Sequence, residues 1–269
     1  MFKDYKETSW PIIIGVVLVF VLLNFIWLNP LKPFALFIGE VTGGVIHPTL
    51  VIGLTDFVLI VGGLVIFTNL RWRDFGLKAA SLLPAIVLIL GLWLLMNVGL
   101  LILALIQGSE ISFANDWQTT GIIAVFGILI SQLFGNALIE ESLFRGFLIP
   151  QLFLKLKGVG DNPFPRGLIY AVILSLVVFT LQHLMNLSNT GIGSVLQTMF
   201  GIFLVGGLFT VFYLRTKNLF LTIGFHALNN APTPIFQSTE AGAQGTMIVL
   251  GILLLLLWSY LPKSLNQSR

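Results

Sequence analysis

The chain contains no cysteine, and only 9% of its 269 residues are charged. The absence of cysteine excludes disulfides, thiolate nucleophiles and cysteine-based metal sites together. The scarcity of charge accompanies a hydrophobic content of 57% and a mean hydropathy of +0.99, which exceed what the core of a soluble protein needs. These values predict an all-α protein built as a polytopic bundle of membrane helices.

The sequence also lacks an internal repeat, a linker and a low-complexity tract. Outside its apolar runs, no segment is large enough to hold a separate core, so we expect residues 1–269 to form a single integral membrane domain. The net charge of +3 could suggest nucleic-acid binding, but the basic residues fall in short loops between apolar segments. We therefore expect a lipid bilayer around the protein and no nucleic acid as partner.

Apolar runs recur along the whole chain at lengths suited to a membrane. A helix of about 17 to 25 apolar residues crosses the hydrocarbon core. By this measure about eight transmembrane helices are expected, of which the seventh is short: residues 11–28, 50–67, 82–106, 121–143, 167–187, 195–214, 218–232 and 247–261. The shorter, glycine-broken segment 34–46 is expected to lie at the interface or to re-enter the membrane.

Basic residues occur at every second loop of this arrangement. They are Lys3, Lys6, Arg71, Arg73, Lys78, Lys155, Lys157, Arg166, Arg215, Lys217, Lys263 and Arg269. The alternate loops carry Glu110, Asp116 and Glu240 or no charge, and Lys32 is the one basic residue on that side, where its side chain can snorkel. Because positive loops stay on the cytoplasmic side, this pattern predicts a multi-pass protein with both termini in the cytoplasm.

Three charged residues lie close together in an apolar segment: Glu140, Glu141 and Arg145. A helix places Glu141 and Arg145, four residues apart, on one face as an ion pair, whereas adjacent residues point about 100° apart. Glu140 is therefore the better candidate for a general base, and Asn136, four residues earlier, could hydrogen-bond it. The alternative is that all three charges sit at the cytoplasmic end of a long helix without a catalytic role.

Two of the three histidines, His183 and His226, fall inside predicted spans. A lone transmembrane histidine often serves only to hydrogen-bond helices together. Glu140 and His183 are each seventeen residues from the basic loop that joins their spans, about 25 Å along a helix, so we expect them at similar depth. His226 is only nine residues after Lys217, which predicts a shallower position unless its helix tilts or that loop is recessed.

A histidine and a carboxamide share one face of the seventh span. His226 and Asn230 are four residues apart, and together they could donate hydrogen bonds to one point, as an oxyanion site requires. Asn229 belongs to an adjacent face and suits this role less well. His47, which precedes Pro48 at the outer end of the second span, is interpreted as an interfacial residue without a catalytic role.

These residues carry a resemblance to a known family. The chain resembles the CAAX protease and bacteriocin-processing family, also called Abi, whose motifs EExxxR, FxxxH and HxxxN occur here in order, over about residues 121–231. The matching residues are Glu140, Glu141, Arg145, Phe179, His183, His226 and Asn230. The resemblance implies an intramembrane endopeptidase, similar to the CAAX prenyl endopeptidase, that acts on a protein or peptide substrate with or without a lipid modification.

The resemblance also implies roles for the motif residues. Glu140 with His183 would activate the water that attacks a peptide carbonyl, and His226 with Asn230 would stabilise the oxyanion. Arg145 would hold Glu141 and fix the orientation of the helix. General acid–base chemistry of this kind suits a carboxylate beside a histidine.

Two readings of the cofactor stay open. Two histidines and a glutamate, here Glu140, His183 and His226, could bind zinc with water in the fourth position. The HExxH helix of soluble metalloproteases is absent, and a Glu140 that bound a metal could not readily also act as the base. We favour a mechanism that requires no cofactor.

Other classes of function fit part of the pattern. A transporter could use the buried carboxylates and histidines as a proton or ion relay, although the absence of a repeat argues mildly against it. A non-proteolytic scaffold or immunity member of the same family is a further alternative. For a protease, the site needs a hydrated cavity, and analogy with the prenyl-protein enzyme leads us to expect its opening on the cytoplasmic, basic side.

Overall fold

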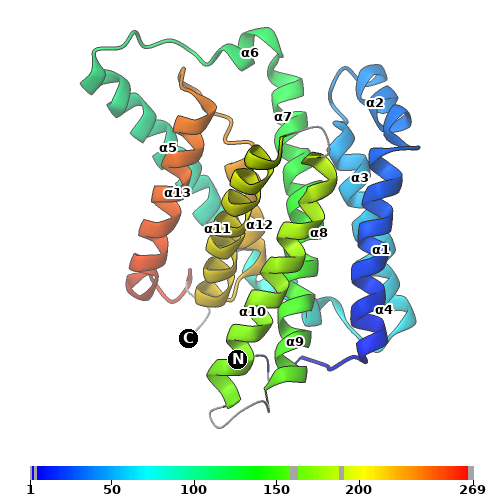
Figure 1. Ribbon diagram of the computed structural model, residues 1–269. Helices are drawn as coiled ribbons and strands as arrows, with labels where there is room; N and C mark the ends of the chain where they lie inside the picture. The colour runs from blue at the N-terminus through cyan, green and yellow to red at the C-terminus, as the bar shows by residue number, and fades with distance from the viewer. Residues whose placement is uncertain (1, 3–4, 158–162, 188–190, 266–269) are drawn as a thin grey trace.

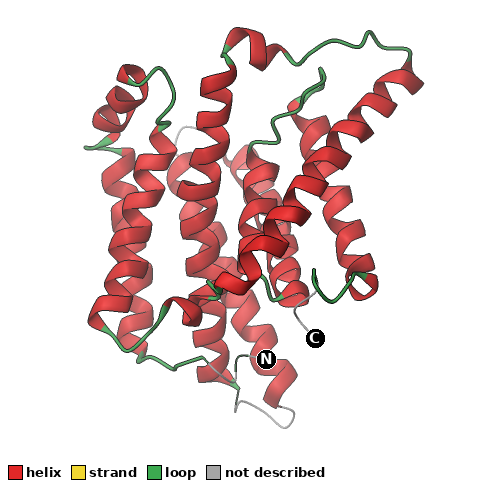
Figure 2. Ribbon diagram, turned by 180° about the vertical axis from the view of Figure 1, so that it is seen from behind, coloured by secondary structure: helices red, strands yellow, loops and turns green. Residues whose placement is uncertain are grey.

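The computed structural model of the protein describes residues 2, 5–157, 163–187 and 191–265, and these form a bundle of helices (Figure 1). Within these ranges there is no strand, and the only β pairing is an isolated bridge between Phe113 and Phe236. Helices joined by loops make up the view from behind as well (Figure 2). The prediction of an all-α polytopic bundle is confirmed.

Seven helical runs of the described chain are long and apolar enough to cross a membrane: Trp10–Leu28, Pro48–Phe67, Ala79–Gln107, Ile122–Leu156, Arg166–Met185, Ile192–Thr216 and Gly242–Tyr260. They correspond to seven of the eight predicted spans. The labelled helices within them are α1 (Trp10–Leu28), α3 (Pro48–Phe57), α4 (Gly63–Phe67), α5 (Leu82–Gln107), α7 (Ile122–Ser131), α8 (Ala137–Glu141), α9 (Ile149–Leu156), α10 (Pro163–Gln182), α11 (Ile192–Thr216) and α13 (Glu240–Leu257).

The seventh predicted span is a short buried helix instead. α12 (Leu219–Asn230) has 12 residues, about 18 Å of helix, and all but two of these residues are buried. It packs against α5, α8, α11 and α13. α12 therefore lies inside the bundle, which explains why this segment is apolar although it is too short to cross a bilayer.

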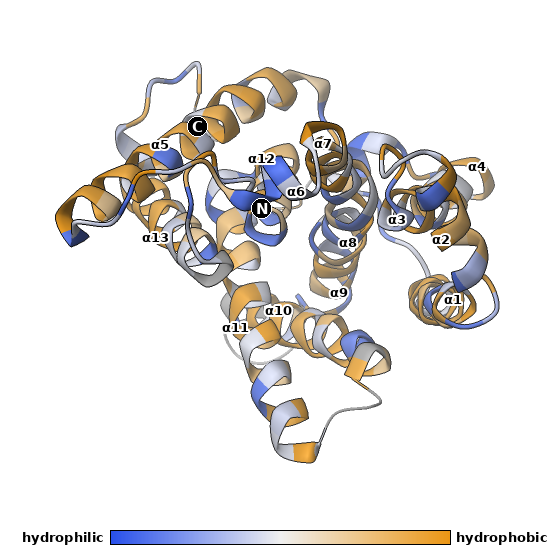
Figure 3. Ribbon diagram, turned by 90° about the horizontal axis from the view of Figure 1, so that it is seen from above, coloured by the Kyte–Doolittle hydropathy of each residue, from blue (hydrophilic) through white to orange (hydrophobic). Residues whose placement is uncertain are grey.

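The outer helices carry most of the exposed apolar surface. Large hydrophobic side chains are exposed along α1, α5 and α13, including Leu18, Leu83 and Leu256. Seen from above, these helices are coloured mainly hydrophobic (Figure 3). Such a surface suits a hydrocarbon environment. The segment 34–46, expected at the interface, forms the short helix α2 (Lys32–Val41) and the turn that follows it.

The basic loops meet at one end of the bundle. Lys6 donates a hydrogen bond to the backbone oxygen of Asn69, beyond α4, and Lys155 at the end of α9 pairs with Glu7 at 2.6 Å. Arg215, at the end of α11, donates to Ser259. The sequence pattern thus grouped these loops correctly. Lys3, Arg269 and residues 158–162 lie outside the described residues, and the cytoplasmic orientation of this end stays a prediction.

The central helical run departs from α geometry on both sides of the glutamates. Residues 122–156 run on as one rod in which two π-helical segments, Gln132–Asn136 and Ser142–Leu148, flank the single turn of α8. A π segment adds a residue to a turn and rotates the following side chains, and such segments occur frequently at functional sites. The run is also longer than the predicted span 121–143.

α3 packs against this rod at backbone contact distance. A Cβ atom on Gly53 would lie 2.4 Å from the carbonyl carbon of Gly135, and one on Gly135 would lie 2.5 Å from the carbonyl oxygen of Thr49. Only glycine permits this approach, as in other small-residue helix interfaces in membranes. The contact holds the first part of the chain against the segment that carries the glutamates.

We predict that Gly53→Ala lowers the free energy of unfolding by about 1–3 kcal/mol, because the added methyl group must push the two backbones apart. Gly62, on the same helical run, is the matched control, since a Cβ atom there meets no atom within 4 Å. Thermal unfolding of both alanine variants in detergent checks this. Equal stability of the two variants would contradict the close contact.

Candidate active site

Glu140 and Glu141 are both buried at the centre of the bundle, 6% and 0% exposed. They occupy the last two positions of α8, between the two π segments. Buried carboxylates require ionic or hydrogen-bonding partners. Besides Arg145 of the same rod, the partners come from the end of α10, the turn that follows it, and α12, so the site is assembled from segments far apart in the sequence.

Glu141 forms the predicted ion pair with Arg145. The guanidinium Nη1 lies 3.1 Å from Oε1 of Glu141, and both side chains are almost fully buried. Nη2 of Arg145 donates to the backbone oxygen of Gly206 at 2.8 Å, and the guanidinium carbon lies 4.4 Å from the centre of the Phe179 ring. Arg145 therefore joins the central rod to α10 and α11.

Glu141 has a second partner, His226 of α12. Nδ1 of His226 lies 2.7 Å from Oε1 of Glu141, the same oxygen that accepts from Arg145. The imidazole also stacks on Phe209, with 4.3 Å between the ring centres. The sequence predicted Arg145 as the only partner of Glu141 and did not predict the contact with His226.

The depth of His226 is explained by a recessed loop, one of the two possibilities open from the sequence. Between α11 and α12, Thr216 and Asn218 are buried rather than exposed. Nδ2 of Asn218 donates to the backbone oxygen of Ser81, and its Oδ1 accepts from the backbone N–H of Leu221 at the start of α12. α12 therefore begins well inside the bundle, and its histidine reaches the level of the glutamates.

Glu140 lies between the two histidines. Oε1 is 3.8 Å from Nε2 of His183, and Oε2 is 3.7 Å from Nε2 of His226. Oε1 accepts a hydrogen bond from Nε2 of Gln182 at 3.1 Å, whereas Oε2 is buried and has no hydrogen-bond partner among the described residues. The sequence brings Glu140 and His183 to the same level, as predicted.

The carboxamide that binds Glu140 is Gln182 rather than the expected Asn136. Asn136 is the last residue of the first π segment, where the regular spacing of four residues no longer places side chains directly above one another. It lines the same cavities as Glu140. The expectation assumed an uninterrupted α-helix.

The hydrogen bonds of both imidazoles define where their protons lie. Nδ1 of His183 is 2.8 Å from the backbone oxygen of Phe179, and Nδ1 of His226 faces the carboxylate of Glu141. Carbonyl and carboxylate oxygens accept only, so each Nδ1 carries a proton. In the neutral state each Nε2 then presents a lone pair toward Glu140.

The side chain of Asn230 is hydrogen-bonded to Gln132 rather than to His226. It is exposed, and its Nδ2 donates to Oε1 of Gln132 at 3.1 Å. It nevertheless lines the cavity of about 360 Å³ that Glu140, His183 and His226 also line. One cavity therefore brings together the four side chains with predicted chemistry.

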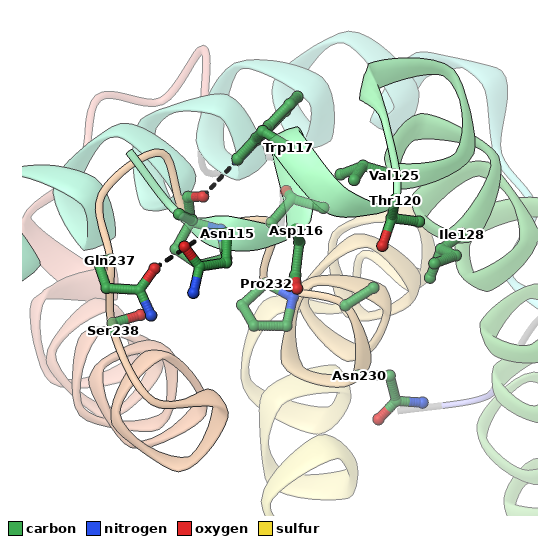
Figure 4. A pocket seen from close by; sticks show the side chains of 14 residues that line it. Asn115, Asp116, Trp117, Thr120, Val125, Ile128, Asn230, Pro232, Gln237 and Ser238 are labelled. Carbon is green, nitrogen blue, oxygen red and sulfur yellow. Dashed lines mark hydrogen bonds between the residues drawn. The ribbon is translucent and has the colours of Figure 1, made fainter. Parts of the chain in front are cut away.

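Asn230 also borders a second cavity, of about 340 Å³, on its other side (Figure 4). This space lies beneath α6 (Asn115–Thr119) and the segment after α12, where Asn115 and Gln237 are hydrogen-bonded. Trp117 of α6 donates to the backbone oxygen of Pro234 and so holds α6 against the segment after α12. Asn230 thus lines both this cavity and the one that contains Glu140 and His226.

The cavities at the glutamates lie away from the basic end. Leu28, at the far end of α1 from Lys6, and Met185, beyond the far end of α10, line the cavity beside Glu140. On the basic side the way is closed by the apolar core of the next turns, where Phe144 and Phe147 are each 1% exposed. The structure contradicts the expected opening on the basic side, because the side chains of that part of the rod are buried in the apolar core.

The residues proposed as possible zinc ligands do not form a metal site in this arrangement. In the described part of the chain, no group of three or more histidine, aspartate or glutamate side chains could hold a metal ion. The two oxygens of Glu140 face different imidazoles. No step involving a metal is therefore derived from this geometry.

The comparison with protein families places this site in a known group. The family model described as type II CAAX prenyl endopeptidase Rce1-like matches residues 122–232. This segment of the chain is similar to the Rce1-like family. The match confirms the resemblance drawn from the three motifs and covers every residue of the candidate site. No curated protein and no solved structure matches the chain.

Several residues of the candidate site were not predicted. Gln182 and Gln132 hold Glu140 and Asn230, and Phe209 stacks on His226. The two glutamines could have been recognised from the sequence, because carboxamides inside apolar spans are costly unless they have hydrogen-bond partners. Phe209 had none, since the chain contains 23 phenylalanines.

His47 lies apart from these residues. Its Nδ1 accepts a hydrogen bond from the backbone N–H of Thr49 and so caps the N-terminus of α3. Asn229 is buried on the neighbouring face of α12. Neither residue lines the cavity that contains Glu140 and His226.

We predict that Arg145→Met lowers the free energy of unfolding by about 3–5 kcal/mol, because the two buried glutamates then lose the guanidinium that offsets one of their charges. Denaturant unfolding in detergent checks this. The double variant with Glu141→Gln should recover part of the loss, since it removes the uncompensated charge. A single variant as stable as the wild type would contradict the structural role of the pair.

Proposed function

We propose that this Rce1-like protein is an intramembrane endopeptidase that hydrolyses a peptide bond with an activated water. The observation that carries the proposal is the single cavity lined by Glu140, His183, His226 and Asn230. These are the residue types that peptide hydrolysis requires, a base, a proton carrier and hydrogen-bond donors. The substrate is a protein or peptide in the membrane, with or without a lipid.

Glu140 and His183 can hold the water between them. Their facing atoms are 3.8 Å apart, too far for a direct hydrogen bond. A water oxygen about 2.8 Å from both Oε1 of Glu140 and Nε2 of His183 can bridge the two atoms. It would donate to Oε1 of Glu140 and to the lone pair on Nε2 of His183, which leaves its oxygen free to attack a carbonyl carbon.

His226 can stabilise the oxyanion only as an imidazolium. Its Nδ1 proton is already donated to Glu141, so a donor toward the cavity requires a second proton on Nε2. The two buried glutamates and Arg145 together carry one net negative charge when ionised, which a protonated His226 balances. This differs from the expectation that His226 would donate without carrying charge.

The proton movements then balance over one turnover. The water oxygen bonds to the carbonyl carbon while Glu140 takes its proton, and the oxyanion accepts hydrogen bonds from His226 and Asn230. Collapse of the intermediate breaks the carbon–nitrogen bond, and the proton held at Glu140 and His183 passes to the leaving amine. Gln182 keeps the carboxylate of Glu140 in place through its hydrogen bond.

We predict that Glu140→Gln, His183→Asn and His226→Asn each lower kcat/KM for peptide cleavage by about 10²–10⁴-fold. His47→Asn is the matched control, because it makes the same change at the histidine outside the site and keeps an N-cap acceptor. Purified protein in detergent with a library of synthetic peptides, read by mass spectrometry, checks this. Equal cleavage by all four variants would overturn the assignment.

Zinc is tested on the same preparation. We predict that exhaustive chelation leaves the cleavage rate within about twofold and that elemental analysis finds less than stoichiometric metal. Loss of activity that returns with added Zn²⁺ would favour the zinc alternative. Uptake of substrate into liposomes without cleavage would instead favour a transporter.

A further inference from the structure

Glu140 and His183 stand between two cavities of different chemistry. One cavity has a volume of about 300 Å³ and lies toward α1 and α3, and the other, of about 360 Å³, lies toward α11 and α12. Asn136, Glu140 and His183 line both. The two spaces therefore meet at the atoms that the proposed function places at the scissile bond.

The cavity toward α1 and α3 is lined mainly by uncharged polar side chains. Besides the three shared residues it includes Asn24, Thr49, Gln132 and Gln182. Carboxamides each offer two donors and an acceptor, the complement of a peptide backbone. Such groups facing lipid would be costly, so their gathering in one cavity indicates a space for water or a polar chain.

The surface of the cavity toward α11 is mainly apolar, although polar residues also line it. Phe179, Ile202, Val205 and Phe209 form its wall. Gly201 lines it as well, and a Cβ atom on Gly201 would meet no atom within 4 Å. The missing side chain at this position leaves room in the cavity beside Glu140.

We infer that the enzyme selects peptide bonds between an apolar and an uncharged polar stretch, with an apolar side chain beside Gly201 and the polar stretch beside Asn24. This inference rests on the proposed endopeptidase function and adds a substrate class to it. The space beside Gly201 sets the size of the apolar residue next to the cleaved bond. The carboxamides on the other side bind the backbone of the polar stretch.

Substitution of Gly201 tests the apolar side. Gly201→Leu fills the cavity, so kcat/KM for peptides with leucine or phenylalanine at that position should fall at least about tenfold more than for the same peptides with alanine. Gly207→Leu is the control, because Gly207 lies on the same helix, has equally open space around its Cβ position and lines neither cavity. Identical size preferences in the two variants would overturn the inference.

A binding test does not depend on turnover. The chain has no cysteine, so Asn24→Cys and Gly201→Cys can each be placed singly in a Glu140→Gln background. Synthetic peptides with one polar and one apolar half, and a single cysteine in either half, serve as disulfide probes. We expect Asn24→Cys to link to the polar half and Gly201→Cys to the apolar half, with Gly207→Cys showing no preference.

The two tests separate the inference from the function it rests on. If the wild type cleaves no peptide but each cysteine links only to the expected half of the peptide, the proposed peptidase activity is wrong and the two cavities form a peptide-binding site. Cleavage with crosslinking that shows no preference, or none at all, would support the peptidase and overturn the inference.

Discussion

The buried group of Glu141, Arg145 and His226 is the interaction on which the site depends. Glu141 accepts from both partners through one oxygen, and Arg145 reaches the backbone of α11. Removal of either partner would leave a charge uncompensated in the buried interior of the bundle. The group therefore fixes three segments relative to one another, and it holds the imidazole of His226 with Nε2 toward Glu140.

A single imidazole explains how two adjacent glutamates serve one site. Neighbours on a helix point about 100° apart, so Glu140 and Glu141 cannot approach the same atom easily. The two nitrogens of His226 lie on different sides of its ring, one facing Glu141 at 2.7 Å and the other facing Glu140 at 3.7 Å. Glu141 is the positioning residue and Glu140 the proposed base, a division that depends on His226 entering from α12.

The sequence predicted what local helix geometry determines. Spacing alone identified the pair Glu141 and Arg145, and counting along two helices placed Glu140 beside His183. It could not predict that Gln182 replaces Asn136, because π segments leave no reliable pattern in apolar sequence. Nor could it decide between a tilted helix and a recessed loop for the depth of His226, since the recessed loop depends on a hydrogen bond between Asn218 and Ser81, more than a hundred residues away.

The same packing decides from which direction a substrate can arrive. Below the glutamates, the rod and its neighbours are filled with phenylalanine and aliphatic side chains. Above them, the rotated π segment turns polar side chains toward α1 and α10, and the recessed α12 leaves space beside α11. The features that bury the charges thus also leave open, on the side away from the basic loops, the two cavities that meet at Glu140.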